Sequence, residues 1–173
     1  DELESGYCLP CQMTPLSDLV LEVPTTSGAA KAAPTVSTAR VEGVTRHSDS
    51  MATLSLVLEQ SFDFLPGQYA NIHAPGSPQA RSYSFSSAPG GTAAEFLIKL
   101  VPGGLMSSYV AQATRGDRVE LLAPFGSFFL RPLRRPTLFL AGGSGLGPFL
   151  SMLRSLEGAQ LDHAVTLMHA VNV

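Results

Sequence analysis

The residues best suited to bind a charged, planar ligand lie in one short stretch near the middle of the chain. Residues 79–87 contain one arginine, one tyrosine and several serines, and turn-forming prolines and glycines flank the stretch on both sides. The alternation predicts a strand with a cationic, aromatic face and a serine face: Arg81, Tyr83 and Phe85 against Ser82, Ser84 and Ser86. A guanidinium pairs with phosphate, and an aromatic ring stacks on a conjugated ligand. The stretch fits equally an edge strand whose serine face is solvated, so both interpretations stay open here.

A second candidate for anion binding is a glycine-rich loop that leads into a helix. Residues 102–104 read Pro-Gly-Gly, and Ser107 and Ser108 fall in the first turn of the expected helix. Apolar residues then recur at helical spacing: Met106, Tyr109, Val110 and Ala113. Unpaired N–H groups and the helix dipole favour a phosphate at such an N-terminus. The alternative is a plain strand-to-helix turn that needs glycine for a positive φ.

A third motif begins at residue 136, where the sequence pattern changes. The continuous apolar run at 137–141 predicts a strand buried on both faces in a parallel sheet, and glycines at 142–147 follow it. Pro148 is expected at the first position of the next helix and Gly158 at its end, before a strand at 164–170. Dinucleotides bind at a glycine turn of this kind. The spacing departs from G-x-G-x-x-G, because Pro148 replaces the third glycine, and no acidic residue ends the second strand.

The N-terminal stretch contains both cysteines of the chain, Cys8 and Cys11. Their C-x-x-C spacing is compatible with half a zinc site, a redox disulfide, an iron–sulfur ligand or two buried structural thiols. A short strand is expected at 18–23, and the small residues and prolines of 24–37 predict a linker. The histidines are scattered at spacings that suit no metal, so we expect none to be a ligand: His47, His73, His163 and His169.

Composition narrows the class of protein. Short strands separated by turns between residues 38 and 132 predict an antiparallel sandwich or barrel, and in one of them Leu54, Leu56 and Leu58 alternate with more polar or smaller residues. Apolar residues make up 45% of the 173 residues and charged residues 14%, which is enough for a packed core in one domain or two small ones. A net charge of −3 without a basic cluster argues against a nucleic-acid partner, and no apolar run is long enough to span a bilayer. Two cysteines and no visible signal peptide favour a reduced, cytoplasmic setting. Because the chain opens at Asp1 rather than at a methionine, its natural start is expected upstream.

In their order and spacing, the motifs resemble the ferredoxin reductase family, and within it the reductase components of benzoate- and anthranilate-type aromatic-ring dioxygenases. Four motifs carry the resemblance: an R-x-Y-S strand, a glycine-serine loop, a G-S-F-F-L segment and a glycine turn with the helix after it, at residues 81–84, 101–109, 126–130 and 141–153. The resemblance implies an antiparallel Greek-key FAD-binding barrel over 38–133, followed by the start of a parallel α/β nucleotide-binding domain over 134–173. Residues 1–23 resemble the tail of a plant-type [2Fe–2S] ferredoxin domain, with 24–37 as the linker.

The resemblance also implies roles for individual residues. Arg81 would pair with the FAD pyrophosphate, while Tyr83 would stack on the isoalloxazine and Ser84 would lie near N5, as the two catalytic residues. The remaining cofactor-binding residues implied by the family motifs are Ser82 on the same strand, Ile98, Lys99 and Leu100 along the ribityl and adenine side, Gly104, Met106 and Ser107 at phosphate, and Gly143, Ser144 and Gly145 toward the nicotinamide nucleotide. Cys11 would be the fourth [2Fe–2S] ligand of a complete protein.

The implied function is electron transfer from NADH through FAD to a [2Fe–2S] centre and on to the oxygenase component of a ring-hydroxylating dioxygenase. Cluster binding takes four cysteines and the chain has two, so we expect a fragment truncated at both ends, with only the flavin barrel whole. Two other hypotheses stay open: the reductase of a phenol- or methane-type monooxygenase, and a flavin-shaped docking module without turnover. An unpaired strand edge in 136–173 is expected to favour association.

Overall fold

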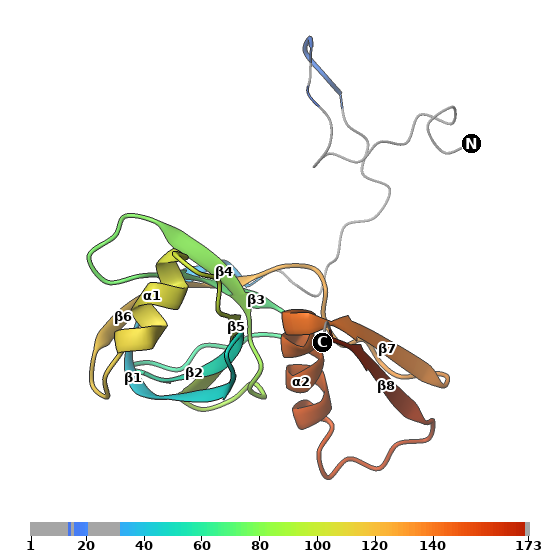
Figure 1. Cartoon of the computed structure of the whole chain (residues 1–173). Coiled ribbons are helices and arrows are strands. Elements are labelled where there is room, and N and C mark those ends of the chain that lie inside the picture. Colours follow the sequence, from blue (N-terminus) through green and yellow to red (C-terminus); the bar gives the residue numbers. More distant parts are fainter. Residues whose placement is uncertain (1–13, 15, 21–31, 172–173) are drawn as a thin grey trace.

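The computed structural model describes residues 14, 16–20 and 32–171, which form two lobes (Figure 1). The larger lobe contains β1 (Thr35–Ser48), β2 (Met51–Leu58), β3 (Tyr69–His73), β4 (Ala80–Ser84), β5 (Ala93–Lys99), α1 (Leu105–Gln112) and β6 (Arg118–Phe125). The smaller lobe contains β7 (Thr137–Gly142), the 3-10 turn η3 (Gly143–Gly145), α2 (Leu146–Ser155) and β8 (Val165–Ala170). In Figure 1, α2 lies between the barrel and the β7–β8 pair.

The strands of the larger lobe form one antiparallel sheet that closes into a barrel. Their order is β4-β3-β6-β1-β2-β5, with β6 inserted between the hairpins β1–β2 and β3–β4. The edge strands meet through an antiparallel bridge between Phe85 and Phe96, and the Ser86 N–H donates to the Glu95 carbonyl at 2.8 Å. We call this junction the seam: Phe85, Ser86, Glu95 and Phe96. The arrangement confirms the expected antiparallel barrel.

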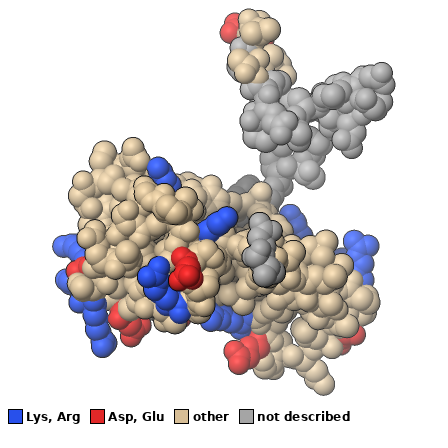
Figure 2. Space-filling view, viewed as in Figure 1, with Lys and Arg blue, Asp and Glu red and all other residues tan. Residues whose placement is uncertain are grey.

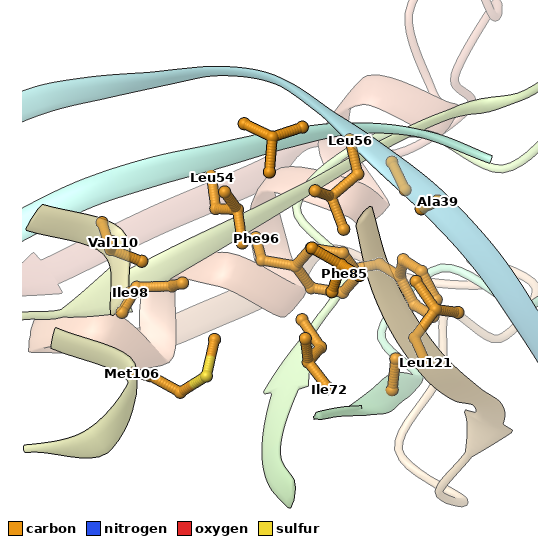
Figure 3. Packing of buried hydrophobic residues seen from close by; sticks show 14 of the residues in the cluster. Ala39, Leu54, Leu56, Ile72, Phe85, Phe96, Ile98, Met106, Val110 and Leu121 are labelled. Atoms are coloured by element: carbon orange, nitrogen blue, oxygen red, sulfur yellow. The ribbon is translucent and has the colours of Figure 1, made fainter. Parts of the chain in front are cut away.

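The barrel is filled by the alternating apolar residues that predicted its strands (Figure 3). β2 buries every second side chain, as the sequence pattern indicated: Ala52, Leu54, Leu56 and Leu58. Phe85 lies at the centre of the cluster, with its ring centroid 3.9 Å from that of Phe64 and 5.0 Å from that of Phe96. Aromatic side chains bury roughly 150–250 Å² each, so these rings supply much of the hydrophobic stabilisation. Helix α1 adds Met106 and Val110 to the same core, which confirms its predicted apolar face.

The first strand begins earlier than the sequence indicated. β1 starts at Thr35, inside the segment 24–37 that composition predicts to be a linker, because Thr35, Val36 and Ser37 pair in register with β6. Residues 16–20 form no strand, so the strand expected at 18–23 is absent from its described part, and the rest of it lies outside the described residues. Cys8 and Cys11 also lie outside the described residues.

The smaller lobe is the predicted strand–helix–strand unit. β7 and β8 are parallel, with Thr137 opposite Val165 and Gly142 opposite Ala170, and α2 connects them. Helix α2 begins at Leu146, so Pro148 is the third residue of the helix. The expectation that Pro148 would be its first residue is therefore wrong. A proline is tolerated there because N–H groups in the first turn of a helix have no partner within the helix.

One face of β7 contradicts the prediction that this strand is buried on both sides. Phe139 and Ala141 are buried, whereas Leu138 and Leu140 are 53% and 64% exposed. Met168 of β8 is exposed beside them, at 58%. The apolar run is therefore correct as a strand, but only one of its faces is covered in the described part of the chain.

The surface carries no single dominant charge patch on the face shown in Figure 2. Basic and acidic side chains are scattered there among a larger uncharged area. Within the described residues, no helix combines the length and the apolar character needed to cross a membrane.

Candidate functional site

Strand β4 presents the predicted arginine, tyrosine and serine at the edge of the barrel. Arg81 is exposed, and its guanidinium donates hydrogen bonds to the Ala80 carbonyl at 2.9 Å and to Gln79 Oε1 at 3.1 Å. Tyr83 is half-buried against the core, and this burial raises the pKa of its hydroxyl, while the nearby Arg81 charge lowers it. Tyr83 therefore stays neutral near pH 7. Ser84 is half-buried at the end of the strand.

Two neighbours of these residues have structural contacts. Ser82 Oγ donates a hydrogen bond to Asn71 Oδ1 at 2.7 Å, which ties β4 to β3. Phe85 is fully buried, and its N–H donates to the Gln68 carbonyl at 3.0 Å. Phe85 was expected on the same face as Arg81 and Tyr83, but its side chain lies in the core and is not available to a ligand.

The start of α1 has the geometry of an anion cradle. Gly103 has a φ of 70°, and a Cβ on Gly104 would lie only 3.0 Å from the Val101 carbonyl oxygen and 3.1 Å from Ser107 Oγ, so the tight turn needs glycine. Ser107 Oγ accepts a hydrogen bond from the Val101 N–H at 2.8 Å, and its own proton remains for donation. By helix geometry, the N–H groups at the start of α1 have no partner within the helix. Met106 contributes only its backbone there, because its side chain is buried in the core.

The predicted residues on and after β5 differ in how far they are exposed to solvent. Ile98 is fully buried in the core, so only its backbone can approach a ligand. Lys99 is exposed, and Leu100 is half-buried against the core. Successive side chains of a strand point to opposite faces, so neighbours in sequence differ in exposure. The family motif alone did not indicate which of these three residues would be exposed.

The glycine turn of the smaller lobe lies directly beside the end of β4. A Cβ on Gly147 would be 3.8 Å from the Ser84 carbonyl oxygen, 4.0 Å from Ser84 Cβ and 3.7 Å from Leu97 Cβ. The preceding residues Gly143, Ser144 and Gly145 form η3, in which no residue is buried. The fold therefore brings the R-x-Y-S strand and the nucleotide-type turn close together at Ser84 and Gly147, which are 63 residues apart in sequence.

Sequence reasoning missed a contact between the lobes. Arg154, in the last turn of α2, donates a hydrogen bond to the Ser86 carbonyl at 2.9 Å and forms an ion pair with Glu95. Both partners belong to the seam. No local signal identifies this pairing, because the three residues come from separate elements and a basic residue near a helix C-terminus is common.

Sequence reasoning also missed a buried glutamine. Gln68 is 3% exposed, its Oε1 accepts from the Leu65 N–H at 2.8 Å, and its Nε2 donates to the Gly126 carbonyl at 3.0 Å. Buried polar groups are stable only when hydrogen-bonded, so Gln68 ties the loop before β3 to the loop after β6. Its position after a Pro-Gly turn was the available signal.

The far end of α1 carries two titrating groups with shifted pKa values. Burial raises the pKa of Tyr109 to about 12, with a smaller contribution from the Asp117 charge, and its hydroxyl has no hydrogen-bond partner in the described structure. The pKa of Asp117 is lowered by hydrogen bonds from the Thr114 backbone N–H and, to a lesser extent, the Thr114 hydroxyl. The Asp117 carboxylate thus stabilises the turn between α1 and β6, and both groups lie apart from Ser84 in sequence.

A cavity between the two lobes is not lined by the predicted site residues. Its volume is about 770 Å³, and it lies beside the loop 127–135, β7 and the Phe149 and Met152 side chains of α2. Within the described residues, no three His, Cys, Asp or Glu side chains gather in a way that could hold a metal ion. The candidate site is therefore defined by the contacts at β4, α1 and the glycine turn.

A family model described as "Oxidoreductase FAD-binding domain" matches residues 38–130, more than half of the chain. The chain belongs to the ferredoxin reductase family of FAD-binding oxidoreductases. The chain is 42% identical over 173 residues to the toluate 1,2-dioxygenase electron transfer component of Pseudomonas putida, an alignment that covers 98% of this chain and 52% of that protein. It is 38% identical over 181 residues to methane monooxygenase component C of Methylosinus trichosporium, with 99% of this chain and 53% of that protein covered.

A solved structure supports the same family. The ferredoxin reductase in carbazole 1,9a-dioxygenase matches with a TM-score of 0.72 and 28% identity, over 80% of this chain and 43% of that one. The chain spans about half the length of the curated relatives it matches. The expected fold class, a flavin barrel followed by the start of a parallel nucleotide-binding domain, is confirmed.

Proposed function

We propose that this chain is the flavin module of an oxygenase reductase, which transfers electrons from NADH through FAD to a [2Fe–2S] centre and then to a ring-hydroxylating dioxygenase. The observation that carries the proposal is the contact between Ser84 of the flavin-type strand and Gly147 of the nucleotide-type turn, which would bring two cofactors together. The printed names of relatives, such as the toluate 1,2-dioxygenase electron transfer component, support the class of partner.

The residues at the barrel edge fit FAD. When bound, FAD supplies the chemistry that links a two-electron hydride donor to a one-electron acceptor. Arg81 is exposed and has donors for a diphosphate, for which a guanidinium is better suited than an ammonium. The N–H groups at the start of α1 and the Ser107 hydroxyl would add neutral donors around the same anion.

The proposed catalytic residues act by orientation. Tyr83 is held against the core and stays neutral, which suits stacking on a flavin ring. The Ser84 hydroxyl would donate a hydrogen bond at the reactive edge of the flavin. Gly143, Ser144 and Gly145 would offer backbone N–H groups to a nicotinamide nucleotide at the carboxyl end of β7.

The iron–sulfur part of the proposal concerns a longer protein. A [2Fe–2S] centre takes four protein ligands, and this chain has two cysteines, of which Cys11 is the proposed fourth ligand. Thiolate ligands persist in a reducing compartment, so a cytoplasmic location is part of the same proposal. The likeness to methane monooxygenase component C keeps a monooxygenase partner as the second candidate.

The experiment that tests the site is a titration of the full chain with FAD, followed by flavin absorbance. Hydrogen bonds to charged groups contribute roughly 1.5–3 kcal/mol, so Arg81→Gln should weaken FAD binding by about 10- to 150-fold. The matched control is Arg46→Gln, which removes an equally exposed charge from β1 and should change the Kd less than about twofold. Equal affinities of the two variants would remove Arg81 from the site. A wild-type chain that binds no FAD would favour the docking-module hypothesis.

A further inference from the structure

Three residues of α2, each about one helical turn from the next, are close to the barrel or buried. Gly147 lies beside Ser84 and Leu97, Ser151 is fully buried, and Arg154 reaches the seam. Residues spaced by three or four lie on one face of a helix. On this face of α2, Gly147 and Ser151 are small, which allows the helix to approach the barrel closely, and Arg154 is charged.

Arg154 holds this face against the point where the barrel closes. Its Nη1 donates to the Ser86 carbonyl at 2.9 Å and pairs with the Glu95 carboxylate, and Ser86 itself is 2% exposed. The Ser86 N–H in turn bonds the Glu95 carbonyl, so one guanidinium links both strands of the seam. Loss of the guanidinium would leave the carbonyl of a buried residue without this donor, which is costly in a protein interior.

The seam begins immediately after Ser84. A residue that fixes α2 on Ser86 therefore also fixes the distance from the glycine turn to Ser84, two residues earlier. The space is narrow, because a Cβ added to Gly147 would already be in van der Waals contact with Leu97 Cβ, at 3.7 Å. Small lateral movements of α2 would open this contact, because Gly147 and Ser151 have no side chains that reach across it.

We propose that Arg154 is a positioning residue, which holds the glycine turn of the smaller lobe against Ser84 and so sets the spacing between the two cofactor-binding elements. The link to cofactors rests on the proposed function, whereas the spacing itself does not. Arg154 acts through Ser86 and Glu95 and does not touch the reacting groups.

The geometry offers a direct reporter of this spacing. Disulfide-bonded cysteines have Cβ atoms about 3.5–4.5 Å apart, and Leu97 Cβ lies 3.7 Å from the Cβ position of Gly147. In the full chain with Cys8→Ser and Cys11→Ser, the pair Leu97→Cys and Gly147→Cys should therefore form a disulfide. Its equilibrium with a glutathione redox buffer gives the effective concentration of one thiol at the other.

We expect Arg154→Met to lower this effective concentration by about 10-fold or more. Arg154→Lys should restore it to within about threefold, because an ammonium has three donors and can serve the same two acceptors. The control is Arg131→Met, which removes a guanidinium that lies over the Phe129 ring and not on the seam, and it should have no effect.

Three results would overturn the proposal: no disulfide in the parent chain, equal effective concentrations for Arg154→Met and Arg131→Met, or a lysine variant as low as the methionine variant. Thermal unfolding of the reduced proteins excludes general destabilisation as the cause of a difference. The FAD titration is independent of the thiol measurement. A chain that fails to bind FAD but shows the expected thiol pattern would refute the proposed function and leave the positioning role of Arg154 intact.

Discussion

Gly67 lies where the two lobes meet, and its replacement by alanine tests the packing of that contact. Its φ is +107°, and a Cβ would lie 2.5 Å from Met152 Cε, 2.7 Å from the Phe128 carbonyl oxygen and 3.1 Å from Phe129 Cα. The methionine end can move, whereas the Phe128 backbone is fixed by the neighbouring Leu130 N–H, which donates to the Pro66 carbonyl at 2.8 Å. The substitution therefore combines backbone strain with overpacking.

The magnitude follows from these two effects. A non-glycine residue in a sparsely populated region costs roughly 1–3 kcal/mol, and overpacking typically costs about 1–3 kcal/mol. We expect Gly67→Ala to lower the free energy of unfolding by about 2–6 kcal/mol, a large share of the 5–15 kcal/mol typical of a domain.

Urea unfolding followed by far-ultraviolet circular dichroism measures this loss, since the chain has no tryptophan to report by fluorescence. The control is Gly76→Ala, which has a φ of +77° but nothing within 4 Å of the new Cβ. It carries the backbone strain alone. If the two variants lose the same stability, the close contact between Gly67, Met152 and Phe128 does not exist in solution, and the described packing of the lobes is wrong.

Three further predictions follow from single residues. Gly147→Ala should stabilise the chain by about 0.5–1 kcal/mol, because alanine is a better helix former than glycine. The new Cβ would make only ordinary contacts, the nearest at 3.7 Å. A loss of stability in urea would contradict the described distance between α2 and the barrel. Tyr109→Phe should not destabilise the chain, because the buried hydroxyl has no partner in the described structure. The wild type should also lose stability as the pH rises from the unfolded value of 10.0 to about 12, since ionisation of Tyr109 favours the unfolded chain, and a Tyr109→Phe variant with the same alkaline profile would refute this. Asp117 has a lowered pKa when folded, so its contribution to stability is present above its ordinary pKa of 3.8 and is lost as the pH falls through the lower, folded value; Asp117→Asn should lack this acid dependence, and an unchanged acid limb in thermal unfolding would exclude it.

The sequence predicted those parts of the fold that depend on local pattern. Alternating leucines in β2 and the helical spacing of Met106, Tyr109 and Val110 correctly identified buried faces. β1 was not recognised as a single long strand, because it contains few large apolar residues, with Ala39 and Val41 as its buried hydrophobic side chains. Its length depends on pairing with β2 and β6, which are distant in sequence.

The site shows the same division. The residue types at Arg81, Tyr83 and Ser84 indicated a ligand strand, but only the folded chain brings Ser84 to Gly147. The link from Arg154 to the seam is likewise a tertiary contact without a local signal. The prediction that β7 is buried on both faces is wrong for the described residues, which cover only one face of the strand. An apolar run indicates that both faces of a strand favour burial, but it does not show which elements pack on them.

The absorbance spectrum of the purified full chain, desalted after incubation with excess FAD, tests the central claim most directly. We expect a flavin band that remains with the protein, and one FAD per chain released on denaturation, because the described barrel and its α1 cradle fit the cofactor. A folded chain that stays colourless under these conditions would contradict the claim that β4, α1 and the glycine turn form a flavin site.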